Sequence, residues 1–126
     1  MIEETNHPDV VAEVKTAFQR YNEAIETGDV DTLNALFWNS PLTVRFGPTE
    51  HLFGYGEIST FRAGTWKRGP ARVIERLAIT ALGKDVATTN ALFRLANGKI
   101  TRQSQTWARV PEGWRIVAAH VSPFPG

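Results

Sequence analysis

The chain contains no cysteine. This absence excludes disulfide bonds, a cysteine nucleophile, zinc sites built on cysteine and iron–sulfur clusters. The sequence also has no apolar run near the ~20 residues that a membrane-spanning helix needs. Its first segment, MIEETNHPDVV, is too acidic and polar for a signal peptide. We therefore expect a cytoplasmic protein that has no membrane partner.

An excess of charge of one sign is also lacking. The chain has 14 Lys and Arg residues against 13 Asp and Glu residues, and its net charge is +1. Nucleic-acid-binding proteins usually carry a basic face or tail, so no nucleic-acid partner is expected. With 126 residues, 42% of them hydrophobic, the chain has the length and composition of one soluble globular domain.

Several motifs of well-known enzymes are missing. The chain has no G-x-S-x-G, no H-E-x-x-H, no Walker loop and no G-x-G-x-x-G. Its three histidines, His7, His51 and His120, lie far apart, and none has a partner two or four residues away. This spacing does not favour a metal site. We expect neither a metal ion nor a cofactor.

The first half of the chain predicts helices. Apolar residues recur every three to four positions over residues 8–27, which indicates one long amphipathic helix that ends at Gly28. A second short helix is predicted over residues 29–37 and a third over residues 57–63. Between them, residues 42–46 alternate with period two and predict a strand, followed by a short returning strand at 51–53.

The second half predicts an antiparallel meander. Turn signals at residues 83–85, 97–98 and 111–113 separate four long strands, which are predicted over residues 71–82, 86–96, 99–110 and 114–122. Helices followed by a long curved antiparallel sheet are typical of an α+β fold. The long helix then covers one face of the sheet, and a cone with an open end encloses a pocket.

Tyr21 lies on the apolar face of the first predicted helix, beside Phe18 and Ile25. A tyrosine in this position can be a core residue whose hydroxyl bonds to the backbone. It can also be a pocket residue that positions a ligand or transfers a proton. The sequence pattern leaves both interpretations open.

Arg45 is the second unusual residue, because it interrupts an apolar strand. Alternation places it on the same face as Thr43, opposite Val44 and Phe46. It can face solvent, or it can enter the cavity and bind an anion, since a guanidinium holds a carboxylate through two parallel hydrogen bonds.

The predicted strand 99–110 has a polar centre, R-Q-S-Q-T-W, where a buried strand would be rich in Val and Ile. Alternation puts Gln103, Gln105 and Trp107 on one face and Arg102, Ser104 and Thr106 on the other. Either face can line the pocket, and the other can form a polar subunit interface.

Three further residues are candidates for the pocket. Trp66 follows Gly64 in a predicted loop and can form the pocket lip, and Arg62 lies on the third predicted helix. Trp114, Ile116, Ala118, His120 and Ser122 are predicted to form one row, in which His120 is either a structural histidine or a proton carrier. The candidate substrate-binding residues are Trp66, Arg62, Gln103, Gln105, Trp107 and His120.

The segments T-V-R-F-G, G-Y-G-E-I-S-T-F-R, R-Q-S-Q-T-W and G-W-R-I-V-A-A-H-V-S, together with a long first helix that carries a tyrosine, resemble the NTF2-like superfamily. More narrowly, the chain resembles the HpxZ/AtzH group, which occurs with oxalurate and cyanuric acid catabolism. The resemblance covers nearly the whole chain. It implies one NTF2-like domain over residues 1–126, an α+β cone that dimerises through the outer face of its sheet.

The resemblance also implies a function. Members of the group act as amidohydrolases on small N-carboxylated ureas of the 1,3-dicarboxyurea type and give allophanate with loss of a carboxylate. The catalytic tyrosine and arginine of the group fall on Tyr21 and Arg45. The implied partners are a small anionic ureido substrate and a second copy in a homodimer, or a tetramer built from it.

A second class of function stays open. NTF2-like domains also serve as non-catalytic subunits, so the chain can instead hold an acidic ligand or assist a partner amidase of the same pathway. The absence of a strong acid–base constellation in the sequence favours this alternative.

Overall fold

The computed structural model describes residues 1–64 and 66–126. Its three helices are α1 (Pro8–Thr27), α2 (Val30–Leu36) and α3 (Tyr55–Ala63). His7 caps α1 by accepting a hydrogen bond from the Asp9 backbone at 3.2 Å, and Pro8 occupies the first turn. Gly28 ends the helix with a φ of 72°, a conformation that favours glycine. The predicted bounds of α1 are confirmed.

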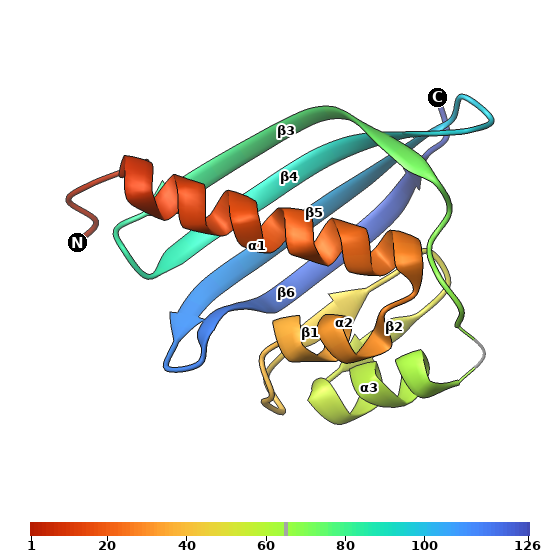
Figure 1. Cartoon of the computed structure of the whole chain (residues 1–126), viewed down its shortest axis with the longest axis horizontal. Helices are drawn as coiled ribbons and strands as arrows, with labels where there is room; N and C mark the ends of the chain where they lie inside the picture. The colour runs from red at the N-terminus through yellow and green to blue at the C-terminus, as the bar shows by residue number, and fades with distance from the viewer. Residues whose placement is uncertain (65) are drawn as a thin grey trace.

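Six strands form one sheet in the order β2-β1-β6-β5-β4-β3 (Figure 1). Their bounds are β1 (Val44–Phe46), β2 (His51–Phe53), β3 (Arg72–Leu82), β4 (Val86–Leu95), β5 (Ile100–Val110) and β6 (Gly113–Phe124). The four long strands pair in antiparallel fashion, as predicted. The short strand β1 joins the edge of β6 in parallel and pairs with β2 in antiparallel fashion.

The helices lie on one face of the curved, unclosed sheet, and the fold is α+β as predicted (Figure 1). Helix α1 crosses the long strands, and α2 and α3 gather beside β1 and β2. The apolar face of α1 supplies much of the core, in which Phe18 stacks on Phe93 of β4 at 6.5 Å between ring centroids. In the described part of the chain, no helix covers the opposite face of the sheet.

Two elements, β1 and α3, begin two residues away from the position that the sequence pattern predicts. The strand predicted over 42–46 is shorter, because the Thr43 hydroxyl donates to the Trp38 carbonyl at 2.7 Å and turns the chain before β1. Helix α3 begins at Tyr55 rather than residue 57, because Gly54 turns the backbone with a φ of 89° directly before it.

The predicted row along the last strand is wrong. A register shift between Thr106 and Trp107 makes Trp107 pair with Ile116 while Thr106 pairs with Ala118. This bulge inserts one residue into β6, so Ile116 before the bulge and Ala118 after it point to opposite faces of the sheet. Ile116 is buried on the helix side, whereas His120 is exposed on the opposite face.

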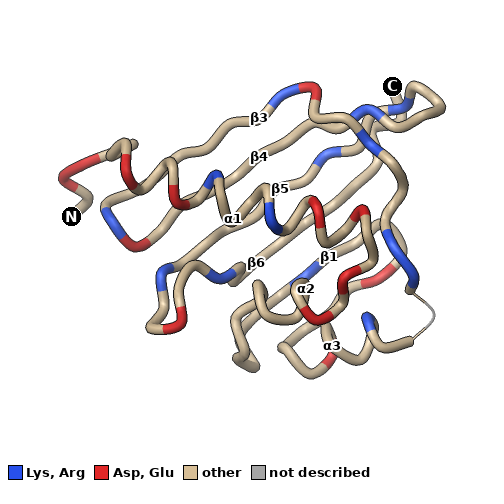
Figure 2. Tube along the Cα trace, viewed as in Figure 1, with Lys and Arg blue, Asp and Glu red and all other residues tan. Residues whose placement is uncertain are grey.

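Acidic and basic residues are interspersed along helices, strands and connections (Figure 2). None of the helices that the structure describes combines the length and the apolar character required to cross a membrane.

Candidate functional site

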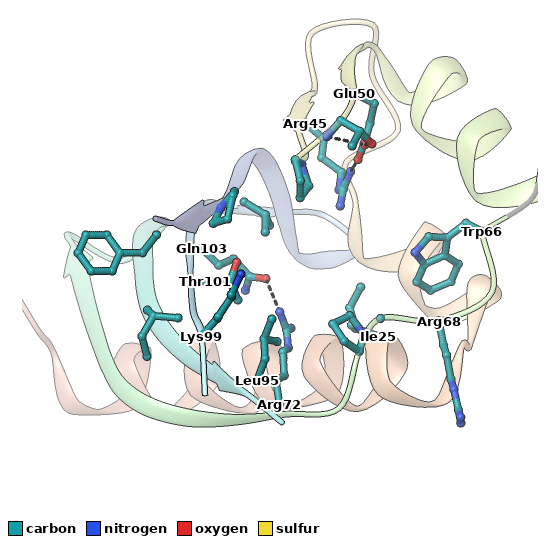
Figure 3. Close-up of a pocket in the computed structure, with 18 of the residues that line it drawn as sticks. Ile25, Arg45, Glu50, Trp66, Arg68, Arg72, Leu95, Lys99, Thr101 and Gln103 are labelled. Atoms are coloured by element: carbon teal, nitrogen blue, oxygen red, sulfur yellow. Dashed lines mark hydrogen bonds and ion pairs between the residues drawn. The ribbon is translucent and has the colours of Figure 1, made fainter. Parts of the chain in front are cut away.

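A cavity of about 400 Å³ opens between α1, the β1–β2 turn and one end of the long strands (Figure 3). Its charged and polar lining consists of Tyr21, Arg45, Thr49, Glu50, Arg68, Arg72, Lys99, Thr101 and Gln103. Its apolar lining includes Ile25, Phe61, Trp66, Leu95, Ile100, Val121 and Phe124. A pocket of this size and mixed lining suits a small molecule.

Tyr21 comes from the buried face of α1, and only 1% of its surface is exposed. Its ring meets the ring of Phe37 edge to face at 6.1 Å, which fixes its orientation. The side chain nevertheless lines the cavity. Both sequence interpretations therefore describe part of its position, since Tyr21 belongs to the core and borders the pocket.

Arg45 reaches the cavity from β1 and is 6% exposed. Its Nη1 donates to Glu50 Oε1 at 2.5 Å, and its guanidinium lies 5.6 Å from the ring centre of Phe61. Gly47 leaves room for this pair, because a Cβ there would lie 1.8 Å from Glu50 Oε1. The β1–β2 turn thus brings a cation and a carboxylate together in one wall of the cavity.

Arg62 projects from α3 and is 2% exposed. Its guanidinium lies 4.7 Å from the ring centre of Trp66 and 5.9 Å from that of Phe37. It is absent from the described lining of the cavity, whereas Trp66 and Tyr21 border it. Arg62 therefore packs against the Trp66 ring without itself belonging to the described lining.

Arg72 at the start of β3 forms the wall opposite Arg45 (Figure 3). Its Nη2 donates to Asn22 Oδ1 at 2.6 Å and its Nη1 to Gln103 Oε1 at 3.4 Å. Its guanidinium lies 3.8 Å from the ring centre of Phe93. These contacts hold a third arginine near Tyr21.

The arginines change the acidity of Tyr21. Burial by itself raises the pKa of the Tyr21 hydroxyl. The opposing effect of the neighbouring cations, Arg62 foremost, is larger, and the pKa lies below its ordinary value. Burial also lowers the pKa values of Arg62 and Arg72, and Tyr21 opposes this effect in both.

Glu50 responds to the same surroundings. Burial raises the pKa of its carboxyl, but hydrogen bonds from Thr49 and Arg45 lower it by more, so the pKa lies below its usual range. Glu50 is the only carboxylate among the described cavity-lining residues, which include four cationic side chains. The lining is therefore suited to an anion.

Several buried donors around the cavity find no acceptor within residues 1–64 and 66–126. These are the Nε atoms of Arg45 and Arg72, the three guanidinium nitrogens of Arg62 and the Nε2 atoms of Gln103 and Gln105. Buried donors are normally satisfied, so the unpaired donors of Arg45, Arg72 and Gln103, which line the cavity, suit a ligand rich in oxygen acceptors.

Gln105 and Trp107 lie deeper, between α1 and the sheet. The Trp107 Nε1 donates to Thr89 Oγ1 at 3.1 Å, and Thr89 Oγ1 donates to Gln105 Oε1 at the same distance. Neither Gln105 nor Trp107 is among the described residues that line the cavity. The inward face of β5 is thus the one with the glutamines, but Gln103 alone of the three predicted residues on it reaches the cavity.

His120 is not brought to this cavity. It packs against Phe46 on the outer face of the sheet, with ring centroids 5.7 Å apart, and pairs in register with Ser104. The bulge in β6 is the physical reason for this position. The histidines also form no cluster of metal ligands in the part of the chain that the structure describes.

The sequence patterns missed Glu50 and Arg72. Glu50 lies in the connection between the predicted strands 42–46 and 51–53, and nothing in the local sequence shows that its carboxylate reaches back to Arg45, five residues earlier. Arg72 is the first residue of a long strand, and its contact with Asn22 spans 50 residues of sequence. The available signal was that Arg72 is a charged residue at the first position of a long strand, where its side chain points toward the helices.

The arrangement has two chemical capacities. Its cations and amide donors can bind and orient carboxylate or carbonyl oxygens, and Tyr21, with its lowered pKa, can exchange a proton with a bound group.

Comparison with known proteins gives a family and a fold. The model of the family described as AtzH-like matches residues 3–125. A structure of a protein of unknown function from the DUF3225 family of Pectobacterium atrosepticum is 43% identical, covers 98% of both chains and has a TM-score of 0.92. A cystatin-like fold protein from Burkholderia xenovorans is 41% identical over 96% of both chains, with a TM-score of 0.90.

A more distant structure carries the fold name. An NTF2-like superfamily protein from Salmonella enterica is 27% identical over 94% of both chains, with a TM-score of 0.75. A comparison with curated proteins gave no match.

Proposed function

The chain belongs to the AtzH-like family and has the NTF2-like fold, and from this premise we propose that it is a cofactor-independent amidohydrolase acting on N-carboxylated ureas or related ureido acids. A compound of the 1,3-dicarboxyurea type is the proposed substrate and allophanate the product. The observation that carries the proposal is the position of Tyr21, which is buried, of lowered pKa and at the edge of a cationic cavity.

Binding of such a substrate follows from charge and hydrogen bonding. A dicarboxylated urea carries two negative charges and presents only carboxylate and carbonyl oxygens as acceptors. Arg45 and Arg72, on opposite walls of the cavity, can each hold one end (Figure 3). The unpaired Nε2 of Gln103 supplies a further donor between them.

The chemical step needs a proton at the departing nitrogen. In the proposed step, the bond between the terminal carboxylate carbon and the urea nitrogen breaks, and its electron pair stays on nitrogen. Nitrogen takes the proton of the Tyr21 hydroxyl, the carboxylate leaves as carbon dioxide, and water converts it to bicarbonate. The Tyr21 phenolate then regains a proton from solvent.

Arg45 stabilises the transition state of this step. As the electron pair moves to nitrogen, negative charge spreads onto the urea carbonyl oxygen, which a guanidinium can stabilise. A preorganised donor of this kind contributes roughly 3–4 kcal/mol, and a general acid contributes roughly 10²–10⁴-fold in rate. N-carboxylated ureas are labile, so these two contributions suffice.

The second candidate function is a non-catalytic one, in which the cavity holds an acidic ligand or the chain assists a partner amidase. The excess of unpaired donors over acid–base groups around the cavity favours it, because such an arrangement binds anions whether or not they react.

Turnover separates the two. We expect the purified protein to release bicarbonate and allophanate from freshly generated 1,3-dicarboxyurea faster than the spontaneous reaction in buffer. Calorimetry with malonate, a stable dicarboxylate, reports binding without chemistry. Malonate binding without accelerated release would assign the chain to the accessory class, and neither binding nor release would contradict both functions.

A further inference from the structure

Arg62 is a buried cation that the proposed substrate does not need to touch. Its side chain is 2% exposed, and none of its guanidinium nitrogens has an acceptor among the residues that the structure describes. An ion taken out of water costs several kcal/mol unless an opposite charge or hydrogen bonds compensate for it. The position therefore calls for a nearby anion.

The side chains around Arg62 offer one candidate. Two aromatic rings, Phe37 and Trp66, contact its guanidinium, and the Phe37 ring also contacts Tyr21. Glu50 acts on Arg62 as well, but its carboxylate is already bound to Arg45. The hydroxyl of Tyr21 is the remaining acidic group beside it.

We propose that Arg62 is the counterion of Tyr21 and a positioning residue for the reaction: it lies outside the described lining of the cavity and stabilises the phenolate that forms when Tyr21 gives up its proton. This inference rests on the proposed role of Tyr21. It assigns Arg62 a function in proton transfer rather than in substrate binding.

The geometry separates Arg62 from the other two arginines. Arg45 and Arg72 line the cavity and each has a partner, Glu50 in one case and Asn22 with Gln103 in the other. A substrate anion can engage both. Arg62 has neither a partner of this kind nor a position in the described lining, so its charge acts on Tyr21 in the empty and the occupied site alike.

Several charged groups surround the Tyr21 hydroxyl and influence its pKa. Arg62 faces it from α3, Arg45 from β1 and Arg72 from β3, and Glu50 in the β1–β2 turn offsets Arg45. Glu26 on α1 acts on Arg72. Of these, Arg62 has the largest lowering effect on the pKa of Tyr21, so its removal has the largest expected consequence.

The ionisation of Tyr21 can be measured directly, because the chain has only one other tyrosine. The other, Tyr55, donates its hydroxyl to the Asn34 carbonyl at 3.0 Å. Tyr55→Phe leaves Tyr21 as the only source of the near-ultraviolet absorbance of tyrosinate. Rapid pH jumps of the folded 126-residue chain then titrate one residue, and a Tyr21→Phe/Tyr55→Phe double variant gives the baseline.

In the Tyr55→Phe protein, we expect Tyr21 to titrate with a midpoint below the ordinary tyrosine value of about 10. Arg62→Met keeps an unbranched apolar side chain between the two rings but removes the charge, and we expect the midpoint to rise. Arg62→Lys keeps a charge without the planar stack, and its midpoint is expected to lie between the two. Arg20→Gln removes an exposed charge next to Tyr21 in sequence and is expected to leave the midpoint unchanged.

Kinetics add a second readout. Arg62→Met is expected to lower kcat for the proposed substrate and to leave KM near that of the parent protein. A raised KM with unchanged kcat would make Arg62 a binding residue and overturn the proposal. An unchanged Tyr21 midpoint in Arg62→Met would overturn it as well.

Failure to fold does not remove the test. If Arg62→Met does not fold, Arg62→Lys carries the test, since its Tyr21 midpoint is expected above that of the Tyr55→Phe protein, and a midpoint at or above the ordinary value in the Tyr55→Phe protein would overturn the proposal. The titration needs no substrate. A low, Arg62-dependent midpoint without turnover would therefore uphold the pair and contradict only the proposed function.

Discussion

Arg45 and Glu50 form an ion pair inside the cavity, with Arg45 Nη1 and Glu50 Oε1 2.5 Å apart. Their side chains are only 8% and 16% exposed. The pair leaves the Arg45 Nε without an acceptor among the described residues. A carboxylate that enters the cavity therefore meets an arginine that is partly engaged, and it shares this cation with Glu50 or displaces it.

Replacing Glu50 with glutamine tests this competition. Glu50→Gln keeps the shape of the side chain and removes its charge, so malonate is expected to bind more tightly, by about fivefold for an interaction of about 1 kcal/mol. Calorimetry measures the dissociation constant. Glu23→Gln, on the exposed side of α1, is the matched control and is expected to change nothing. Weaker binding in Glu50→Gln would mean that Glu50 orients Arg45 rather than competing for it.

The Arg45–Glu50 pair also makes the free energy of unfolding depend on pH in the acid range. The pKa of Glu50 is lowered in the folded chain, so the folded state holds its proton less tightly than the unfolded state does. The contribution of Glu50 is fully present above the unfolded pKa of about 4.3 and is lost as the pH falls through the folded pKa. Urea unfolding at a series of pH values should show a shallower acid decline for Glu50→Gln than for the parent. Equal slopes in the two proteins would contradict the prediction.

Removing the Tyr21 hydroxyl tests the chemical step. Tyr21→Phe keeps the ring contact with Phe37 and removes the proton donor, so kcat is expected to fall by about 10²–10⁴-fold with a smaller change in KM. Release of bicarbonate from the proposed substrate is the measurement. Tyr55→Phe, which removes the other hydroxyl of this kind, should retain turnover. Full turnover in Tyr21→Phe would sink the mechanism.

Sequence patterns predicted the fold well because local physical rules decide it. The period of α1, the Gly28 stop and the turns between the long strands each depend on a few neighbouring residues. Tyr21 and Arg45 were found by the same reasoning, as polar groups in apolar patterns. Both lie at the cavity.

The remainder of the site depends on contacts between distant segments. The Arg72 contact with Asn22 spans 50 residues, and the return of Glu50 to Arg45 depends on the shape of one turn. The position of His120 depends on a bulge, and strict alternation cannot reveal the extra residue that reverses the face of β6. These features depend on how distant segments pack together, and the local periodicity of the sequence does not encode them.

Gly28 connects the end of α1 to a wall of the cavity. Its φ is 72°, and a Cβ there would lie 2.5 Å from the Lys67 backbone oxygen. Gly28→Ala is therefore expected to cost about 1–2 kcal/mol for the left-handed conformation and more for the displaced 66–70 segment. Gly83→Ala is the matched control, because Gly83 has a φ of 65° but open space around it. Urea unfolding should show a larger loss for Gly28→Ala, and malonate affinity should fall in that variant alone.

We propose that the predicted homodimer forms through the outer face of the sheet. The described helices lie on the opposite face, and the exposed residues at the middle of β4, β5 and β6 include Asn90, Ser104 and Ala118, with the apolar Leu92 also exposed on β4. Ser104 Oγ donates to Asn90 Oδ1 at 2.6 Å, so these two polar groups are already paired within one chain. A second copy can then cover these two groups without leaving either of them unpaired.

A long cation in the middle of this face should prevent that packing. Ala118→Arg places a charge beside His120 and is expected to convert a dimer into a folded monomer, because an unpaired charge at the centre of an interface costs several kcal/mol. Gln19→Arg on the exposed side of α1 adds the same charge away from the sheet and should leave the assembly unchanged. Sedimentation velocity measures both variants. A dimer that survives Ala118→Arg, or a parent chain that is monomeric at micromolar concentration, would contradict the assignment of this face, whereas the cavity lies on the helix side and its ligand affinity should be the same in both variants.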